Sequence, residues 1–136
     1  MSQAKPIRKQ TELTEAVPET VSPQLLMKFS YAWEGIKAAF KSELSLRIQL
    51  AVSVAVVLAG VLLGLTQVEW LFVIGSIGVV ISLELLNTAI EKMLDFLHPA
   101  RHDSVKFIKD VSAAAVLIAS LTSVIVGVII FSRYLF

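Results

Sequence analysis

Acidic side chains at helical spacing follow an uncharged apolar stretch, and they are the strongest candidates for chemistry in this sequence. Glu84, Glu91 and Asp95 come after residues 70–83, which contain no charge. On an α-helix the three carboxylates fall within roughly 40° of one another, with Asn87 beside them. Carrying a carboxylate into a bilayer costs at least ~2.5 kcal/mol on insertion scales. We therefore interpret this polar stripe as a functional site.

The side chains of the stripe suit metal binding and proton transfer. Mg²⁺ is usually held by one or two carboxylates together with phosphate oxygens of a substrate. A glutamate that lipid partly desolvates can serve as a general base near neutral pH. Glu43 and the pair Lys109-Asp110 are expected on the same side of the membrane. Together these groups predict phosphoryl transfer to a lipid hydroxyl at the membrane surface.

Three apolar segments have the length needed to position the stripe in a bilayer. They cover residues 48–66, 68–91 and 110–131, each near the ~20 residues that a spanning helix requires. The hydrophobic fraction of 56% and the mean hydropathy of +0.77 are too high for an ordinary soluble fold. We predict an all-α integral membrane protein, with residues 23–136 forming one domain.

The placement of basic residues predicts the orientation of the chain. They lie before the first span and between the second and third, at Lys5, Arg8, Lys9, Lys28, Lys37, Lys41, Arg47, Lys92, Arg101, Lys106 and Lys109. By the positive-inside rule the N-terminus is cytoplasmic. If the second span enters near Val68, Glu84 lies ~24 Å along its axis, inside the hydrocarbon, and Glu91 emerges at ~35 Å.

Two different segments precede the first span. Residues 1–22 are polar and lack an apolar signal-peptide core, so we expect a flexible cytoplasmic tail. Residues 24–43 carry apolar side chains every three or four positions, opposite lysines. This pattern predicts an amphipathic helix in the membrane interface, with Tyr31 and Trp33 at headgroup depth. A simple membrane anchor is the alternative.

The connections and helix ends carry further expectations. Ala51, Ala55 and Ala59, followed by Gly60 and Gly64, predict a close packing face on the first span. Residues 66–69 predict a tight hairpin. Residues 96–109, with His98 and His102, predict a solvated loop. Asp110 is then the N-cap of the third span, and Lys109 at this positive helix end favours an anion nearby.

Two other classes fit the same residues. A small proton- or cation-coupled transporter would use the intramembrane glutamate to exchange proton and substrate. In a structural subunit Glu84 and Asn87 would form hydrogen bonds between helices. The net charge of +1 gives no reason to expect a nucleic-acid partner, and the sequence has no cysteine. It also has no Walker-type or kinase glycine-rich loop.

The polar segments resemble one known family. The matching residues are Glu84-Leu-Leu-Asn-Thr-Ala-Ile-Glu91, Asp95, His98-Pro99, Lys109-Asp110 and residues 112–116, with Tyr31-Ala-Trp-Glu-Gly35 and Glu43 upstream. Together they resemble the bacterial integral-membrane diacylglycerol kinases, a family that includes undecaprenol kinases, over about residues 28–131. The resemblance implies a homotrimer of three-span subunits, each with an interfacial helix, and active sites shared between neighbours.

The resemblance also implies roles for individual residues. Glu84 would be the base that accepts the lipid hydroxyl proton, and Asn87 would orient groups around the magnesium ions. Glu43 and Glu91 would hold Mg²⁺ bridging to ATP. The nucleotide would contact Tyr31, His102, Lys109 and Asp110. The lipid would enter near Lys28, Trp33, Ala38, Arg47 and Ala113.

Some residues depart from the family pattern. Gln24 stands where enterobacterial diacylglycerol kinases carry arginine, leaving Lys28 as the nearest cation, and Leu44-Ser45 replaces an Arg-Asn pair. The sequence from Ser82 to Glu91 is closer to undecaprenol kinases. The predicted function is an ATP- and Mg²⁺-dependent kinase of the bacterial inner or plasma membrane that converts diacylglycerol to phosphatidic acid. Phosphorylation of undecaprenol to undecaprenyl phosphate is the alternative within the family.

Overall fold

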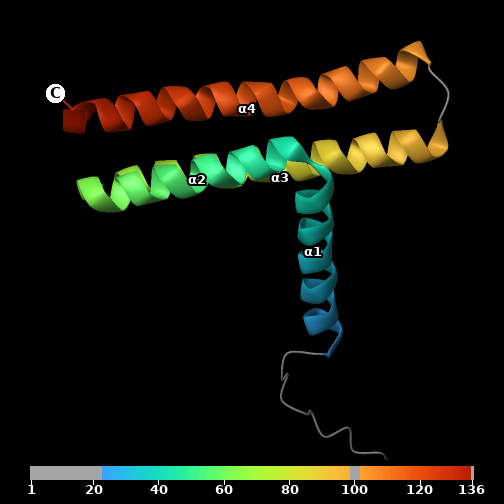
Figure 1. The fold of residues 1–136 in the computed structure, drawn as a ribbon, viewed down its shortest axis with the longest axis horizontal. Coiled ribbons are helices and arrows are strands. Elements are labelled where there is room, and N and C mark those ends of the chain that lie inside the picture. Colours follow the sequence, from blue (N-terminus) through green and yellow to red (C-terminus); the bar gives the residue numbers. More distant parts are fainter. Residues whose placement is uncertain (1–22, 99–101, 136) are drawn as a thin grey trace, which may run out of the picture.

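The computed structural model describes residues 23–98 and 102–135, and four α-helices account for nearly all of them. They are α1 (Pro23–Ser42), α2 (Leu44–Leu63), α3 (Gln67–Leu97) and α4 (Asp103–Leu135). Figure 1 shows α2, α3 and α4 running alongside one another, with α1 standing across them. The predicted all-α membrane fold is confirmed, because α2, α3 and α4 are each long and apolar enough to cross a bilayer. The predicted tail, 1–22, lies outside the described residues.

The surfaces of the spanning helices are apolar rather than polar. Large side chains such as Leu62, Leu71 and Ile118 point outward and are 85%, 74% and 65% exposed. In water such a surface would be unstable, whereas in a bilayer lipid chains cover it at little cost. The few buried side chains lie mostly where α3 meets its neighbours, so α3 is the helix around which the others are placed.

A tight connection joins α2 to α3. Gly64 ends α2 with φ +71°, a left-handed conformation that glycine adopts without a side-chain clash. Thr66 then begins α3 through a reciprocal pair of hydrogen bonds with Glu69, known as a capping box. One turn before the end of α2, Gly60 is buried, and a methyl group added there would lie 3.0 Å from the Trp70 ring. The predicted hairpin is therefore confirmed.

The predicted packing face on α2 is only partly correct. Gly60 makes the expected close approach. Ala51 and Ala55, by contrast, are exposed in this chain. Small side chains at these two positions leave that part of α2 open to lipid or to another copy of the chain.

The predicted solvated loop between the second and third spans is largely helical. α3 continues to Leu97 and α4 begins at Asp103, so the connection is much shorter than residues 96–109. Asp110 is therefore not an N-cap, and Lys109 does not lie at the end of a helix, which removes the argument for an anion there. Instead, Nδ1 of His102 accepts a hydrogen bond from the backbone N–H of Ser104 at 3.2 Å. His102 thus caps the actual start of α4.

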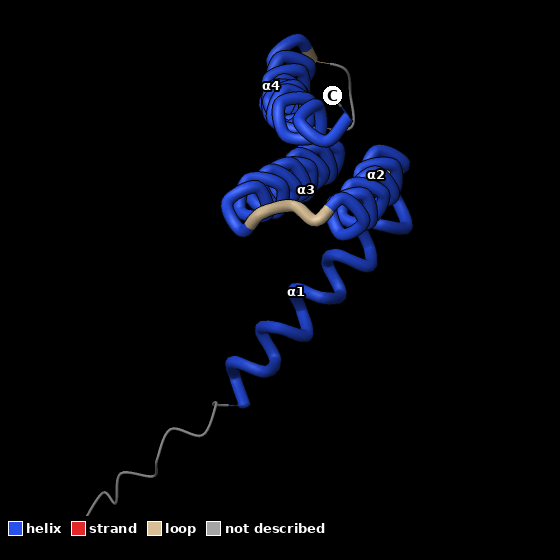
Figure 2. The backbone as a smooth tube through the Cα atoms, turned by 90° about the vertical axis from the view of Figure 1, so that its left-hand side faces the viewer, coloured by secondary structure: helices blue, strands red, loops and turns tan. Residues whose placement is uncertain are grey.

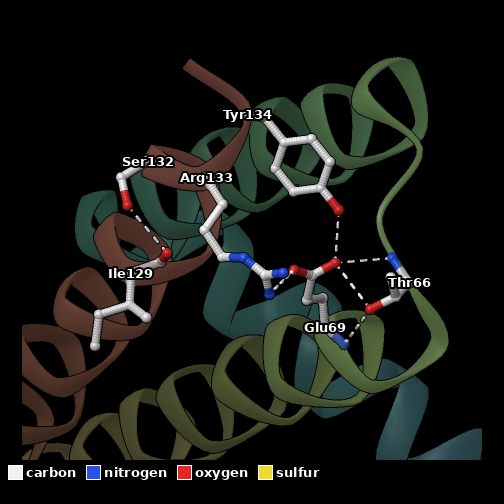
Figure 3. Close-up of polar contacts among 6 residues, drawn as sticks. All are labelled: Thr66, Glu69, Ile129, Ser132, Arg133 and Tyr134. Atoms are coloured by element: carbon white, nitrogen blue, oxygen red, sulfur yellow. Dashed lines mark hydrogen bonds and ion pairs between the residues drawn. The ribbon is translucent and has the colours of Figure 1, made fainter. Parts of the chain in front are cut away.

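A polar network fastens the other end of the bundle (Figure 3). The Glu69 carboxylate accepts hydrogen bonds from the Tyr134 hydroxyl at 2.6 Å and from the Thr66 backbone N–H at 2.9 Å. Arg133 adds an ion pair at 3.0 Å, although its own side chain is largely exposed. Leu65, Val73 and Ile130 form a small apolar core beside this network. The end of α4 is therefore tied to the start of α3.

Candidate active site

The polar face of α3 lies between α2 and α4. Relative to Glu84, Asn87 is turned roughly 60° to one side and Lys92 roughly 80° to the other, while Glu91 shares its direction. The structure agrees, because Asn87 bonds to Ser112 of α4 and Lys92 pairs with Glu43, the residue just before α2. Figure 2 shows these helices nearly end on, with α1 leading away from them. The predicted stripe therefore faces both neighbouring helices.

Glu84 is the most enclosed of the candidate residues. It is only 5% exposed, and both of its carboxylate oxygens accept hydrogen bonds from α2. The Ser45 hydroxyl donates to Oε1, and Nε2 of Gln49 donates to Oε2 at 3.1 Å. Donors of this kind offset the cost of burying a carboxylate between apolar helices. The position therefore suits a carboxylate that acts within the bilayer.

Asn87 connects α4 to the second glutamate of the stripe. Its Oδ1 accepts a hydrogen bond from the Ser112 hydroxyl at 2.6 Å, and its Nδ2 donates to Oε1 of Glu91 at 3.0 Å. The Glu91 carboxylate fixes which way the amide faces, because an ionised carboxylate only accepts hydrogen bonds and therefore requires the NH₂ end. Oδ1 is then left facing the Ser112 hydroxyl, which also lies within hydrogen-bond distance of the Lys109 carbonyl. Asn87 therefore connects Ser112 of α4 to Glu91.

Glu43 lies at the junction of α1 and α2, opposite the C-terminal half of α3. Its Oε1 is 3.1 Å from Nζ of Lys92, the residue that follows Glu91 in the sequence. The hydrogen bond from Lys92 is the main reason that the pKa of the Glu43 carboxyl lies below its usual value, and Ser42 adds to the effect. Glu43 therefore contacts α3 at Lys92, and the other carboxylate of the predicted metal site, Glu91, is the preceding residue of α3.

The pair Lys109-Asp110 lies on α4, one to two turns from its start. Lys109 forms an ion pair with Asp95 of α3, whereas Asp110 is exposed. Asp95, the acidic residue without a predicted role, is therefore the partner of Lys109. Because both side chains of this pair are partly or largely exposed, a ligand phosphate could compete with Asp95 for the lysine.

The remaining predicted residues are not gathered around the stripe. On α1, Tyr31 is 63% and Trp33 61% exposed. The other members of the predicted lipid entrance are also exposed, namely Lys28, Ala38, Arg47 and Ala113. A single chain thus brings together the residues of α2, α3 and α4 but leaves the contribution of α1 open.

The acidic groups suit a metal site that water and substrate phosphates complete, rather than a site enclosed by protein ligands alone. Within residues 23–98 and 102–135, no three His, Asp or Glu side chains come together as a metal-binding group. Mg²⁺ does not need such a cage, since it is commonly held by one or two carboxylates with water and substrate phosphates completing the shell. The carboxylates of Glu43 and Glu91 match that requirement in donor chemistry.

Four residues of the site escaped the sequence prediction as partners. Ser45 and Gln49 hold Glu84, Ser112 holds Asn87, and Lys92 pairs with Glu43. The signal for the first two was present in the sequence. Ser45, Gln49 and Ser53 are each four residues apart, so they form one polar stripe on α2.

An apolar groove continues from the site toward the other end of the bundle. It has a volume of about 620 Å³ and is lined by all three spanning helices, including Gln49, Val56, Ile77, Val80 and Phe131. Ile77 and Val80 share the direction of Glu84 on α3 to within roughly 40°. Glu84 therefore lies next to the Gln49 end of the groove.

Comparisons with known proteins agree with this arrangement. The family model for prokaryotic diacylglycerol kinase matches residues 30–131. A diacylglycerol kinase of Synechocystis sp. is 40% identical over 79% of this chain, and the alignment spans 62% of that relative's length. An undecaprenol kinase of Bacillus subtilis is 37% identical over 76% of this chain and 84% of its own. A diacylglycerol kinase of Escherichia coli is 34% identical over 75% of this chain and 84% of its own. The chain therefore belongs to the prokaryotic diacylglycerol kinase family.

Proposed function

We propose that this protein is an ATP-dependent lipid kinase that transfers the γ-phosphate to the hydroxyl of diacylglycerol, giving phosphatidic acid. The observation that carries the proposal is Glu84, a carboxylate enclosed between apolar helices and held by two neutral donors. A carboxylate at that depth is within reach of a lipid hydroxyl. Family membership supports a kinase over the transporter and the structural subunit.

In this proposal the two ends of the polar stripe have different tasks. Glu84 accepts the proton of the lipid hydroxyl as the oxygen attacks the γ-phosphorus. Glu43 and Glu91 hold Mg²⁺, which neutralises charge on the ATP phosphates when it is bound. Asn87 supports this task through its hydrogen bond to Glu91. Lys109 contacts the nucleotide phosphates once it leaves Asp95.

The relatives support two acceptor lipids. Two of those described above are named diacylglycerol kinases and one an undecaprenol kinase, at similar identity. Both acceptors are long apolar molecules with one hydroxyl, so both satisfy the chemistry at Glu84. Diacylglycerol is the primary proposal, and undecaprenol is the second.

The proposal extends to assembly and orientation. Residues of α1 lie away from the stripe, and the apolar faces of α2 and α4 are exposed, which favours a homotrimer that completes each site with a neighbour. The basic residues favour a cytoplasmic N-terminus in the inner membrane. The exposed aromatic residues of α1 favour a location of this helix at the membrane interface.

The direct test is lipid-dependent ATP turnover by the purified full-length protein in mixed micelles. Diacylglycerol and undecaprenol are supplied in parallel, and the lipid phosphate product is measured. We expect turnover with diacylglycerol that requires Mg²⁺ and that Glu84→Gln abolishes, since the amide cannot accept the proton. Glu34→Gln, an exposed glutamate on α1, is the control and should retain turnover.

Each alternative outcome has a distinct meaning. Turnover with undecaprenol alone would assign the second acceptor. Full activity of Glu84→Gln would remove Glu84 as the base. A protein without turnover on either lipid would contradict the kinase proposal, and flux measurements in liposomes would then examine the transporter.

A further inference from the structure

The hydrogen-bond partners of Glu84 share an unusual property. Both come from one face of α2, on successive turns, and neither carries a charge. Arginine and lysine can only donate hydrogen bonds, so either would hold a glutamate in its ionised form. A serine hydroxyl and a glutamine amide can both donate and accept. Ser45 and Gln49 can therefore bond to Glu84 with or without its proton.

The oxygen of the Gln49 amide is available for a further hydrogen bond. Its Nε2 donates to Glu84, while its Oε1 is the one buried side-chain polar atom in the described ranges that has no hydrogen-bond partner. A buried acceptor without a partner is costly in a native structure. Rotation of the amide by half a turn would exchange the two ends and present Oε1 to Glu84. That acceptor has a use only when Glu84 carries a proton.

We propose that Ser45 and Gln49 are positioning residues that stabilise Glu84 both as the carboxylate before phosphoryl transfer and as the carboxylic acid after it. The inference rests on the proposed function. During transfer the lipid O–H bond breaks and its proton moves to a Glu84 oxygen. The lipid oxygen forms a bond to the γ-phosphorus, and the bond from that phosphorus to ADP breaks. The new Glu84 O–H then donates to Oε1 of the rotated Gln49 amide or to Oγ of Ser45.

Kinetics of matched variants test the positioning role. Gln49→Met keeps the length of the side chain but removes the amide, and Ser45→Ala removes the hydroxyl. We expect each to lower kcat by about tenfold, the loss for one hydrogen bond to a charged group, and to leave the KM values for ATP and lipid within about twofold. Ser45→Thr restores the hydroxyl and should recover most of the lost kcat. Ser53→Ala is the control, because that hydroxyl bonds only to the Gln49 backbone carbonyl.

An infrared measurement reports the same hydrogen bonds without turnover. In protein equilibrated at acidic pH, the C=O stretching band of protonated Glu84 is identified by its loss in Glu84→Gln. We expect Gln49→Met and Ser45→Ala to move this band to higher wavenumber, since each removes a hydrogen-bond partner, and Ser53→Ala to leave it in place. A change in packing alone would not produce this pattern.

The outcomes separate the inference from the proposed function. Lipid-dependent turnover by the unchanged protein, together with full kcat in both Gln49→Met and Ser45→Ala, would overturn the inference and leave the kinase proposal intact. A Glu84 band that stays in place in both variants would also overturn it. If the unchanged protein shows no turnover at all, the kinase proposal fails and the inference fails with it.

Discussion

Nζ of Lys92 lies 3.1 Å from Oε1 of Glu43, so a cation that adjoins Glu91 in the sequence occupies one of the two predicted metal ligands. The lysine side chain is 60% exposed and the glutamate side chain 20%. An ammonium in this place balances the carboxylate when no divalent cation is present. It must give way when a metal binds to the same oxygen.

The first prediction concerns this competition for Glu43. Lys92→Gln should lower the Mg²⁺ concentration that gives half-maximal turnover by up to about fivefold, because an exposed ion pair contributes up to about 1 kcal/mol. We expect kcat to change little. The measurement is a Mg²⁺ titration of lipid phosphorylation, with Lys37→Gln on α1 as the control. A higher Mg²⁺ requirement in Lys92→Gln would show that the lysine assists metal binding instead.

The same pair predicts a pH dependence of stability. The pKa of Glu43 in the folded protein is lowered from 4.5, chiefly by Lys92. A lowered pKa stabilises the folded state above the unfolded pKa, and this contribution is lost as the pH falls through the folded pKa. With EDTA present, unchanged protein should denature at a higher temperature than Lys92→Gln near neutral pH. The difference should shrink below pH 4.5 and vanish when Glu43 is protonated. An equal difference in denaturation temperature at neutral pH and below pH 4.5 would contradict an origin in the pair of Glu43 and Lys92.

The second hydrogen bond of Asn87 gives a prediction for Ser112. Ser112→Ala removes the hydroxyl that holds Oδ1, so the amide is less firmly fixed in the orientation that donates to Glu91. We expect the Mg²⁺ requirement to rise by roughly threefold to tenfold, in line with one hydrogen bond of about 1 kcal/mol. Asn87→Leu should have a larger effect. Thr122→Ala is the control on α4, since its hydroxyl bonds to the Ile118 carbonyl. An unchanged titration in both Ser112→Ala and Asn87→Leu would remove Asn87 from metal binding.

The pair of Lys109 and Asp95 predicts different effects for its two members. Lys109→Gln should raise the KM for ATP by about tenfold or more and the KM for lipid by less than about twofold, because a phosphate contact is lost. Asp95→Asn should change the KM for ATP by less than about threefold, since the ion pair is largely exposed. Initial rates at varied ATP and at varied lipid supply both constants. Equal losses for ATP and lipid in Lys109→Gln would argue against a nucleotide contact.

The sequence predicted those parts of the fold that depend on regular spacing and membrane length. The three spans, the hairpin at Thr66 and the shared direction of Glu84 and Glu91 all follow from helix geometry and hydropathy. The helix ends did not follow, because polar residues such as Lys106 and Asp103 look like loop residues in a membrane sequence. In the structure α4 simply continues beyond the apolar segment to Asp103.

The partners within the site were harder to predict for a different reason. Whether Ser45 meets Glu84 depends on how α2 is rotated against α3, and the spacing within either helix does not contain that angle. Asp95 illustrates the same limit, since its partner Lys109 lies on another helix. Membership of the kinase family supplied the expected roles, whereas the structure supplied the contacts among them.

The last prediction concerns the Glu69 network far from the active site. Tyr134→Phe removes the shortest of its hydrogen bonds, 2.6 Å from Oε2, and Glu69→Ala removes the network entirely. Because the network joins the start of α3 to the end of α4, both variants should lower the thermal denaturation midpoint, and Glu69→Ala should lower it more. Neither should change the KM for ATP, since the network lies at the opposite end of α3 from Glu91. Thermal denaturation followed by circular dichroism and initial-rate kinetics provide the two measurements, with Glu34→Ala on α1 as the exposed control. A KM effect without a change in the midpoint would instead place the network in catalysis, at variance with its position at the far end of the bundle.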